Sequence, residues 1–366
     1  MFIQTISLCQ FKNYLKADIA FDKKVNCFVG ENGAGKTNLL DAIYYTCISK
    51  SYFNNKEAGN ILFEKDFFRI DAHIQDSDEQ KALRLLYANG RKKELSIDQV
   101  KYEKLSEHVG RFPVVIITPD DNQLILGGSE DRRRFMDALL SQMDSKYLQY
   151  LQIYNRQLTQ RNALLKRFAE NGRFERQMLK AYEIPMAEAA TYIAEKRKEL
   201  IELIVPQFHE LYAKISGEKE HVSLSYASEV YGKDMLELFE QNLSIDRNIR
   251  RSSEGVHRDD MEFEMNGQKV KRFASQGQQK SYLIALKLAQ VALLEKISKK
   301  KPLLLLDDIF DKLDDQRGRH LLEFILNPDF GQVFISDTSR ERIEKQFAGN
   351  LDNIAIFKVE NGNVYA

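Results

Sequence analysis

The chain has 366 residues, which is long for one compact core and short for three. Its 43% hydrophobic content is ordinary for a globular protein, and 54 basic residues balance 54 acidic ones, so any basic surface must be local and offset elsewhere. Three cysteines without paired metal-type spacing, no signal-peptide pattern and no apolar run of membrane-spanning length predict a reduced, cytoplasmic protein without a membrane partner.

Residues 1–119 have the pattern of β-strands around a single helix. Strands are predicted at 3–8, where apolar residues alternate, and at the apolar runs 25–29 and 114–117. Residues 67–98 predict an antiparallel meander with a hairpin turn at Asn89-Gly90. After Thr37 the spacing becomes helical, with one apolar face made of Leu39, Leu40, Ile43 and Tyr44.

Residues 120–300 are predicted to be mainly helical. Two apolar stripes at helical spacing, separated by Asn171-Gly172, predict two long antiparallel helices of about 25 residues, each roughly 37 Å long. A helical subdomain core is favoured over an extended dimerising coiled coil. Strands return from His221, and a further helix is predicted at 281–297.

Residues 301–366 return to the strand pattern, with predicted strands at 302–308, 332–337 and 353–359. No internal repeat or low-complexity linker interrupts the chain. The sequence therefore predicts an α/β fold in which 1–119 and 301–366 form one lobe and 120–300 form an inserted helical lobe.

A Walker A phosphate loop lies between the apolar strand 25–29 and the helix after Thr37. Backbone amides of such a loop cradle phosphates, Lys36 supplies charge to the β- and γ-phosphates, and the Thr37 hydroxyl binds Mg²⁺. A chance glycine-rich turn is the alternative, but the flanking strand and helix argue against it. The expected nucleotide-binding residues are Gly30, Glu31, Asn32, Gly33, Ala34, Gly35, Lys36, Thr37 and Asn38.

The apolar strand 303–306 ends in Asp307 and Asp308. With a phosphate loop upstream, Asp307 is predicted to hold Mg²⁺ through water or Thr37, and Asp308 to act as the general base on the attacking water. The alternative is a solvated strand end.

A third motif, 275–279, reads Ser-Gln-Gly-Gln-Gln and precedes a periodic helix. Ser275, Gly277 and Gln278 lie where a helix N-terminus can present donors to the γ-phosphate held by a second subunit. This arrangement predicts an ATP-dependent homodimer in which Ser275 takes part in catalysis. A simple capped helix start is the alternative, since Ser is a favoured cap.

Together with 311–314 as a D-loop, these motifs resemble the ABC-type P-loop ATPases of DNA repair, whose lobe has mixed sheets. Within that class the chain resembles the RecF family. Further matches, which span nearly the whole chain, are the blocks 11–14, 30–38, 131–137, 255–260 and 273–280. Val256 and Lys280 depart from the family pattern, which has Pro and Arg there, and Asp337-Thr338 replaces the ABC switch histidine.

The resemblance implies an ATP- and Mg²⁺-dependent dimer that binds single-stranded DNA gaps and double-strand/single-strand junctions. With RecO and RecR it would help to load RecA during recombinational repair and replication restart. The short Asp308 and the missing histidine predict slow hydrolysis. The resemblance implies that DNA stimulates this hydrolysis and that it times dimer dissociation.

Basic side chains give weaker predictions of DNA contacts. The candidates are Arg132-Arg133-Arg134, Lys12, Lys50, Lys56 and Arg91-Lys92-Lys93, and each cluster has a solvated face as its alternative. A second interpretation applies to the block His257-Arg258-Asp259-Asp260, which could form internal salt bridges that order the signature region.

Three other functions share parts of this pattern. A transporter-type ATPase subunit would need a membrane partner, a structural-maintenance protein would need much longer coiled coils, and a P-loop kinase would not need ATP to dimerise. Stimulation by DNA or by a membrane complex would separate the first alternative from the RecF-like function.

Overall fold

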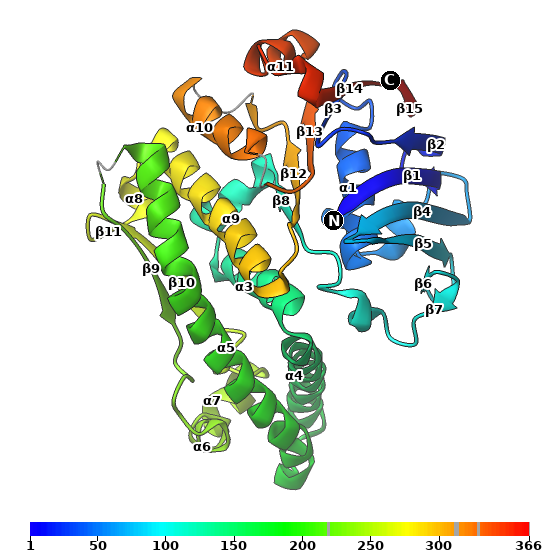
Figure 1. Ribbon diagram of the computed structural model, residues 1–366. Coiled ribbons are helices and arrows are strands. Elements are labelled where there is room, and N and C mark those ends of the chain that lie inside the picture. The colour runs from blue at the N-terminus through cyan, green and yellow to red at the C-terminus, as the bar shows by residue number, and fades with distance from the viewer. Residues whose placement is uncertain (218–219, 311–314, 328–329, 366) are drawn as a thin grey trace. The chain divides into compact units, whose positions relative to one another are not determined.

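The computed structural model describes residues 1–217, 220–310, 315–327 and 330–365 (Figure 1). The chain divides into two compact units, the first made of Met1–Asp121 with Ile284–Ala366 and the second of Asn122–Leu283. The predicted boundaries lie after residues 119 and 300 and place 284–300 in the helical lobe. The structure instead groups those residues with the two ends of the chain.

The first unit contains a six-stranded sheet with the order β15-β14-β3-β13-β12-β8. All neighbours pair in parallel except β14 and β15, and every residue of β3, β12 and β13 is buried. The carboxyl ends of β3, β13 and β12 therefore meet at one edge of the sheet. The strands are β3 (Val25–Val29), β8 (Val114–Ile117), β12 (Leu303–Asp307), β13 (Val333–Asp337), β14 (Ile354–Glu360) and β15 (Asn363–Tyr365).

A second six-stranded sheet in the same unit is antiparallel, with the order β2-β1-β4-β5-β6-β7. The predicted meander is confirmed, and Gly90 has a φ of 72° in its hairpin turn. The strands are β1 (Phe2–Phe11), β2 (Tyr14–Ala20), β4 (Phe67–Asp76), β5 (Glu79–Ala88), β6 (Glu94–Ile97) and β7 (Val100–Lys101).

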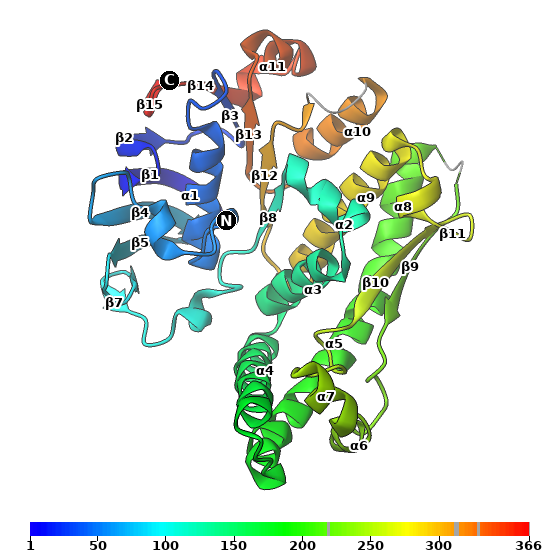
Figure 2. The same cartoon turned by 180° about the vertical axis from the view of Figure 1, so that it is seen from behind.

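Helix α1 (Lys36–Ile48) lies between these two sheets, because it packs on β12 and β13 and also on β1 and β4 (Figure 2). The predicted apolar face, Leu39, Leu40, Ile43 and Tyr44, is buried in this core. The helix after the phosphate loop is thus fixed from both sides. The unit also contains α10 (Asp315–Leu326), α11 (Arg340–Gln346) and short 3₁₀ helices at Glu57–Asn60, Leu105–His108, Pro119–Asn122 and Leu351–Asn353.

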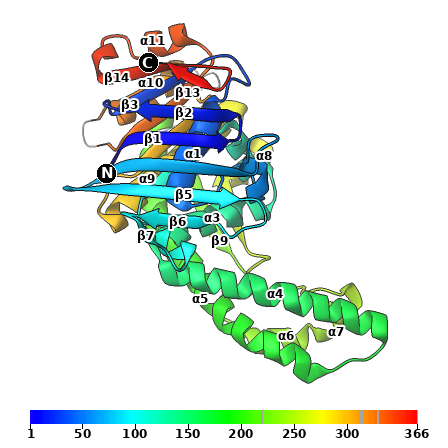
Figure 3. The same ribbon diagram turned by 90° about the vertical axis from the view of Figure 1, so that its right-hand side faces the viewer.

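The second unit is built on α4 (Ser145–Asn171) and α5 (Arg176–Ser216), which lie side by side (Figure 3). The predicted antiparallel pair is confirmed, and α4 ends at Gly172 with a φ of 65°. The length expected for the second helix is wrong, because α5 has 41 residues and continues through Pro185 and Pro206. Proline usually interrupts a helix, and here burial against α4 outweighs that cost.

Shorter elements complete the second unit. A three-stranded sheet has the order β11-β10-β9. These elements are α2 (Gln123–Leu126), α3 (Ser129–Met143), β9 (Val222–Ala227), α6 (Met235–Gln241), α7 (Leu243–Ile249), β10 (Asp260–Met265), β11 (Gln268–Lys269) and α8 (Val270–Phe273). Helix α9 (Gln276–Ser298) contains the boundary between the units. No helix within the described ranges is long and apolar enough to cross a bilayer.

Candidate nucleotide-binding site

The phosphate loop connects β3 to α1 and depends on two close backbone approaches. A Cβ on Gly30 would lie 2.1 Å from the Val359 carbonyl oxygen of β14. Gly35 has a φ of 116°, and a Cβ there would lie 2.4 Å from Asn13 Nδ2 and 2.6 Å from the Tyr14 hydroxyl. Glycine is therefore required at both positions for steric reasons.

The side chains that crowd Gly35 also hold the loop in place. The Tyr14 hydroxyl donates to the Gly35 carbonyl at 2.9 Å, and Asn13 Nδ2 donates to the Ala34 carbonyl at 3.1 Å. Asn38 Nδ2 in turn donates to Asn13 Oδ1 at 2.7 Å. These contacts give the block 11–14 a role that the sequence did not reveal: it clamps the loop from the antiparallel sheet.

Lys36 lies against the loop that precedes it. Its Nζ donates to the carbonyls of Gly30 at 2.9 Å and Glu31 at 3.0 Å, and the residue is only 4% exposed. Glu31, Asn32 and Gly33, in contrast, are exposed at the turn. The loop therefore exposes its backbone to solvent, and the Lys36 ammonium lies against the buried side of the loop. This arrangement suits an anionic ligand.

The predicted partners Thr37 and Asp307 are brought together by the sheet. Thr37 Oγ1 donates to Asp307 Oδ1 at 2.8 Å and lies 3.1 Å from Oδ2. Ser336 lies near the end of β13, the strand between β3 and β12. Its hydroxyl donates to Asp307 Oδ1 at 2.6 Å. Burial raises the pKa of Asp307, while the hydrogen bonds from Ser336 and Thr37 act in the opposite direction.

Asp308 follows β12 in an unusual conformation. Its φ is 45°, its backbone N–H donates to Ser336 Oγ at 3.0 Å, and its Oδ1 is buried without a hydrogen-bond partner among the described residues. A left-handed backbone and an unsatisfied buried acceptor both cost free energy, and such costs cluster at ligand sites. The position fits a carboxylate that is kept for a ligand.

The same oxygen atoms fit Mg²⁺. Thr37 and Asp307 offer a hydroxyl and a carboxylate, and the unpartnered Asp308 oxygen adds a further acceptor. No group of three or more His, Cys, Asp or Glu side chains in the described ranges is placed to hold a metal alone. Mg²⁺ commonly uses one or two carboxylates and takes its other ligands from phosphates and water.

Asp337 connects β13 to the phosphate loop through its backbone. Its carbonyl accepts the Gly30 N–H at 3.3 Å. Its carboxylate accepts the Ser339 N–H at 2.8 Å and Arg342 Nη1 at 3.1 Å, and burial raises its pKa. The residue at the place of the switch histidine therefore uses its side chain to hold Ser339, the N-cap of α11, and Arg342.

Ser275 forms a reciprocal cap at the start of α9. Its Oγ accepts the Gln278 N–H at 3.3 Å, and Gln278 Oε1 accepts the Ser275 N–H at 2.7 Å. This pair of hydrogen bonds is a capping box, so the motif does begin a capped helix, as its alternative interpretation predicts. Ser275 is nevertheless exposed, so a role toward a second subunit stays a prediction. The predicted D-loop at 311–314 lies outside the described residues.

Most of the predicted DNA-contacting arginines of α3 form internal contacts. Arg132 pairs with Asp260 at 2.6 Å, and Arg133 donates to the Asp259 carbonyl at 2.6 Å. The Asp259 carboxylate pairs with Arg197 of α5, a residue only 2% exposed. The block 257–260 thus forms internal ion pairs, as its second interpretation predicts.

Two of the scattered lysines are also engaged internally. Lys12 pairs with the fully buried Asp41 at 2.5 Å, and Lys93 pairs with Glu57. Both lysine side chains are 9% exposed, so neither is available to bind DNA in this conformation. The other candidates, Lys50, Lys56, Arg91 and Lys92, are exposed.

A buried polar relay in the first unit was not predicted. Asp41 of α1 accepts the Tyr52 N–H at 2.7 Å, and the Tyr52 hydroxyl donates to Asp121 Oδ1 at 2.8 Å. Asp121 also pairs with Lys287 of α9 at 2.7 Å. The relay connects α1 with Asp121 and α9, which lie at the two boundaries between the units. No sequence motif marks it, because its members are far apart along the chain.

Comparisons with known proteins agree with this geometry. A family model described as the RecF/RecN/SMC N-terminal domain matches residues 2–364. The DNA replication and repair protein RecF of Flavobacterium johnsoniae is 46% identical over 344 residues, covering 94% of this chain and 96% of that protein. RecF of Phocaeicola vulgatus is 41% identical over 366 residues, covering 100% and 98%.

Solved structures of RecF and of an Smc head domain are also similar to this chain. The structure of the recombination mediator protein RecF-ATPrS in the RecFOR pathway has a TM-score of 0.89 and 27% identity, covering 100% of this chain and 97% of that one. The Pyrococcus furiosus Smc head domain, with a TM-score of 0.54 and 18% identity, shares the fold. The predicted α/β ABC-type ATPase fold is confirmed, and the chain belongs to the RecF family.

Proposed function

We propose that this protein is an ATP-dependent DNA-binding protein of recombinational repair and replication restart. Relatives in its family are DNA replication and repair proteins, and two similar structures are RecF bound to ATP or ATPrS. The observation that carries the proposal is the meeting of Thr37, Asp307 and the unpartnered Asp308 Oδ1 beside the phosphate loop.

The chemistry follows from these positions. Loop amides and Lys36 bind the β- and γ-phosphates. Thr37 and Asp307 would hold Mg²⁺, which would supply positive charge to neutralise the phosphates. Asp308 accepts a proton from water as the water oxygen bonds to the γ-phosphorus. The bond between that phosphorus and the β–γ bridging oxygen breaks, and ADP and phosphate leave. The short carboxylate and Asp337 at the switch position support slow hydrolysis.

ATP is proposed to close a homodimer on DNA. Ser275, Gly277 and Gln278 begin α9, whose N-terminus suits the γ-phosphate of a second copy. DNA stimulates hydrolysis, and hydrolysis reopens the dimer. We propose that the unit made of Met1–Asp121 and Ile284–Ala366 supplies the nucleotide lobe of each copy, and that Asn122–Leu283 supplies the signature lobe.

The proposed partners are single-stranded DNA, double-strand/single-strand junctions, RecR, RecO and, indirectly, RecA, in the cytoplasm. The similar RecF of known structure is a recombination mediator protein of the RecFOR pathway, which supports this assignment.

The test is sedimentation of the protein with ATP, with ADP and without nucleotide, each with and without gapped DNA. We expect a dimer with ATP only, and binding to DNA by that dimer. Ser275→Arg should retain ATP binding and fail to dimerise, because a bulky cation replaces a small donor. Dimers that form equally without nucleotide, or a Ser275→Arg variant that dimerises normally with ATP, would contradict the proposal.

A further inference from the structure

One segment of the second unit carries four exposed arginines, Arg247, Arg250, Arg251 and Arg258. None of them forms an ion pair with a carboxylate in the described part of the chain. We call these four residues the arginine surface. Four acidic residues lie near them in sequence. Asp246 and Asp259 are buried and bound to other arginines, and Asp260 pairs with Arg132. Glu254 is half-buried and forms no ion pair with any of the four within the described ranges.

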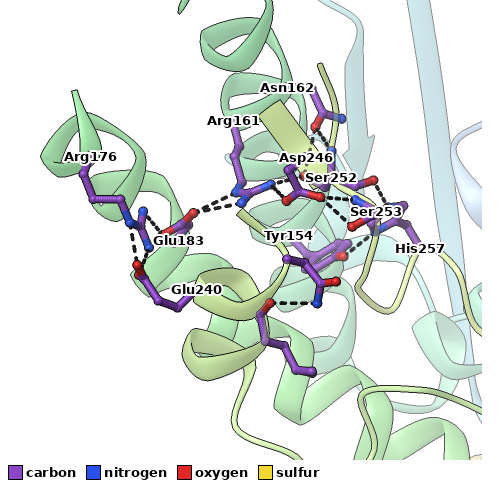
Figure 4. A network of polar contacts seen from close by, with 12 residues as sticks. Tyr154, Arg161, Asn162, Arg176, Glu183, Glu240, Asp246, Ser252, Ser253 and His257 are labelled. Carbon is purple, nitrogen blue, oxygen red and sulfur yellow. Dashed lines mark hydrogen bonds and ion pairs between the residues drawn. The ribbon is translucent and has the colours of Figure 1, made fainter. Parts of the chain in front are cut away.

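Asp246 anchors this segment through hydrogen bonds and an ion pair (Figure 4). Its Oδ2 pairs with Arg161 Nη1 at 2.6 Å, and its Oδ1 accepts the Ser253 N–H at 2.8 Å and the Ser253 hydroxyl at 2.5 Å. Its carbonyl accepts the Arg251 N–H at 3.1 Å. The backbone that carries Arg250 and Arg251 is therefore tied to buried Asp246, through its carbonyl at Arg251 and through its carboxylate at Ser253.

Two further contacts fix the rest of the segment. The Ser252 N–H donates to Asn162 Oδ1 of α4 at 2.7 Å, and the Tyr154 hydroxyl lies 2.7 Å from His257 Nδ1. Gly255 has a φ of 143°, and a Cβ there would lie 2.2 Å from the Tyr154 hydroxyl. A backbone held this firmly loses little conformational entropy when its arginines bind a ligand.

The anchoring arginine is itself held by a larger network. Arg161 is fully buried and also pairs with Glu183 at 3.0 Å, and Glu183 pairs with Arg176 at 2.5 Å. Arg176 continues to Glu240 of α6 (Figure 4). Buried ion pairs carry a large desolvation cost, so this network is better explained by positioning α6, α7 and the arginine surface than by stability alone.

A pocket of about 400 Å³ lies beside the start of the arginine surface. Phe168, Phe174 and Arg247 line it together with Ser244 and Asn248. The two rings meet edge to face at 5.3 Å, and the Arg247 guanidinium lies 4.2 Å from the centre of the Phe174 ring. Aromatic rings beside guanidinium and amide donors are the groups that stack on unpaired bases and bond their edges.

We infer that the arginine surface binds the phosphate backbone of single-stranded DNA and that the adjoining pocket takes an unstacked base. The inference rests on the proposed function, and it names the surface of the second unit that contacts the unpaired strand of a gapped substrate. Unpaired arginines suit phosphate oxygens, and the pocket distinguishes a single strand from a duplex, whose bases are stacked.

The test compares Arg247→Ala/Arg250→Ala/Arg251→Ala with Lys65→Ala/Lys104→Ala/Lys345→Ala. The control removes the same charge from exposed residues of the first unit that form no ion pair within the described ranges. Anisotropy of a labelled oligo-dT and of a labelled hairpin duplex is measured with ATP and Mg²⁺ at several salt concentrations.

We expect the first variant to lose at least tenfold in oligo-dT affinity, with a salt slope lower by about 2 if all three phosphate contacts are lost. Duplex binding, ATP binding and the control variant should be unchanged. Phe174→Leu should weaken oligo-dT binding at least fivefold and leave the salt slope unchanged, since stacking on one base contributes about 1–3 kcal/mol.

Two results would overturn the inference. One is oligo-dT affinity and salt slope equal to those of the wild type in the triple arginine variant, and the other is an equal loss of single-strand and duplex binding. A wild-type protein that binds neither DNA with ATP would contradict the proposed function itself, so the two failures are distinguishable.

Discussion

The phosphate loop and the arginine-rich start of α3 both suggest ligand binding in the sequence, but the structure uses them in opposite ways. The loop leaves Glu31, Asn32 and Gly33 exposed and keeps an unpartnered acceptor at Asp308 nearby. Arg132 and Arg133 instead turn toward Asp260 and the Asp259 carbonyl. A motif defined by backbone sterics predicts function well, whereas a run of charges predicts it poorly, because its partners lie more than a hundred residues away.

The largest expected effect is the loss of ATP hydrolysis when Asp308, beside the phosphate loop, is replaced. Asp308→Asn keeps the shape of the side chain but cannot accept the proton, so hydrolysis should fall about 10²–10⁴-fold. ATP binding should persist, since Lys36, Thr37 and Asp307 remain, and the dimer should stay longer on gapped DNA. Phosphate release and DNA dissociation are measured together.

Lys36→Met is the matched control for Asp308→Asn, because it should lose ATP binding as well as turnover. If Asp308→Asn hydrolyses slowly yet leaves DNA as fast as the wild type, hydrolysis does not time release.

On the arginine side, Arg197→Met should reduce stability and leave the chemistry intact. Arg197 donates to the Val256 carbonyl at 2.6 Å and pairs with Asp137 and Asp259, so its loss leaves two carboxylates without their buried cation. Breaking such a pair costs about 3–5 kcal/mol. Urea unfolding should show this loss, with unchanged ATP affinity in the folded protein. A variant as stable as the wild type would show that these charges are not structural.

Acid should weaken the first unit through His108, which is fully buried and in contact with Thr46 of α1. Its Nε2 lies 2.7 Å from the Thr46 carbonyl, and burial lowers the pKa of His108 from its ordinary 6.5 to about 4. In the unfolded chain His108 therefore binds a proton below about pH 6.5, whereas in the folded chain it stays neutral down to about pH 4.

Stability should consequently fall by about 2 kcal/mol between pH 7 and pH 5 through this residue alone. His108→Gln removes that component, so its urea midpoint should depend less on pH over the same window. An equal pH dependence in variant and wild type would rule out His108 as its source.

The smallest effect tests the signature motif. Ser275→Ala removes the Oγ that caps α9, which should cost about 1 kcal/mol of stability. If Ser275 also acts on the nucleotide of a second copy, ATP-dependent dimerisation should fall by more than this loss explains, whereas Ser275→Thr should restore the cap. Full dimerisation by the Ala variant would leave Ser275 with its capping role only.

Much of the site could be predicted because its constraints are local. The glycine spacing of 30–35 encodes a turn, and the apolar strand 303–306 encodes a buried parallel strand that ends in two carboxylates. The pairing of Thr37 with Asp307 follows once both strands are placed in one parallel sheet. The supports of the site were not predictable, because Tyr14, Ser336 and Val359 are ordinary residues whose roles depend on tertiary contacts.

The fold was predicted less completely in the second unit. The break at Gly172 marked the end of α4 because the left-handed backbone there favours glycine. The full length of α5 was missed, because Pro185 lies within it and local rules count proline as a stop. Long-range packing decides such cases.

The position of β3 between β13 and β14 has a consequence for folding during synthesis. The phosphate loop follows Val29, but both neighbours of its strand come from residues 333–360, about three hundred residues later. At about 5–20 residues per second, a ribosome needs roughly 15–60 s to supply them. The nucleotide site therefore remains unfinished through most of translation, and a chain that stops before β13 cannot enclose ATP.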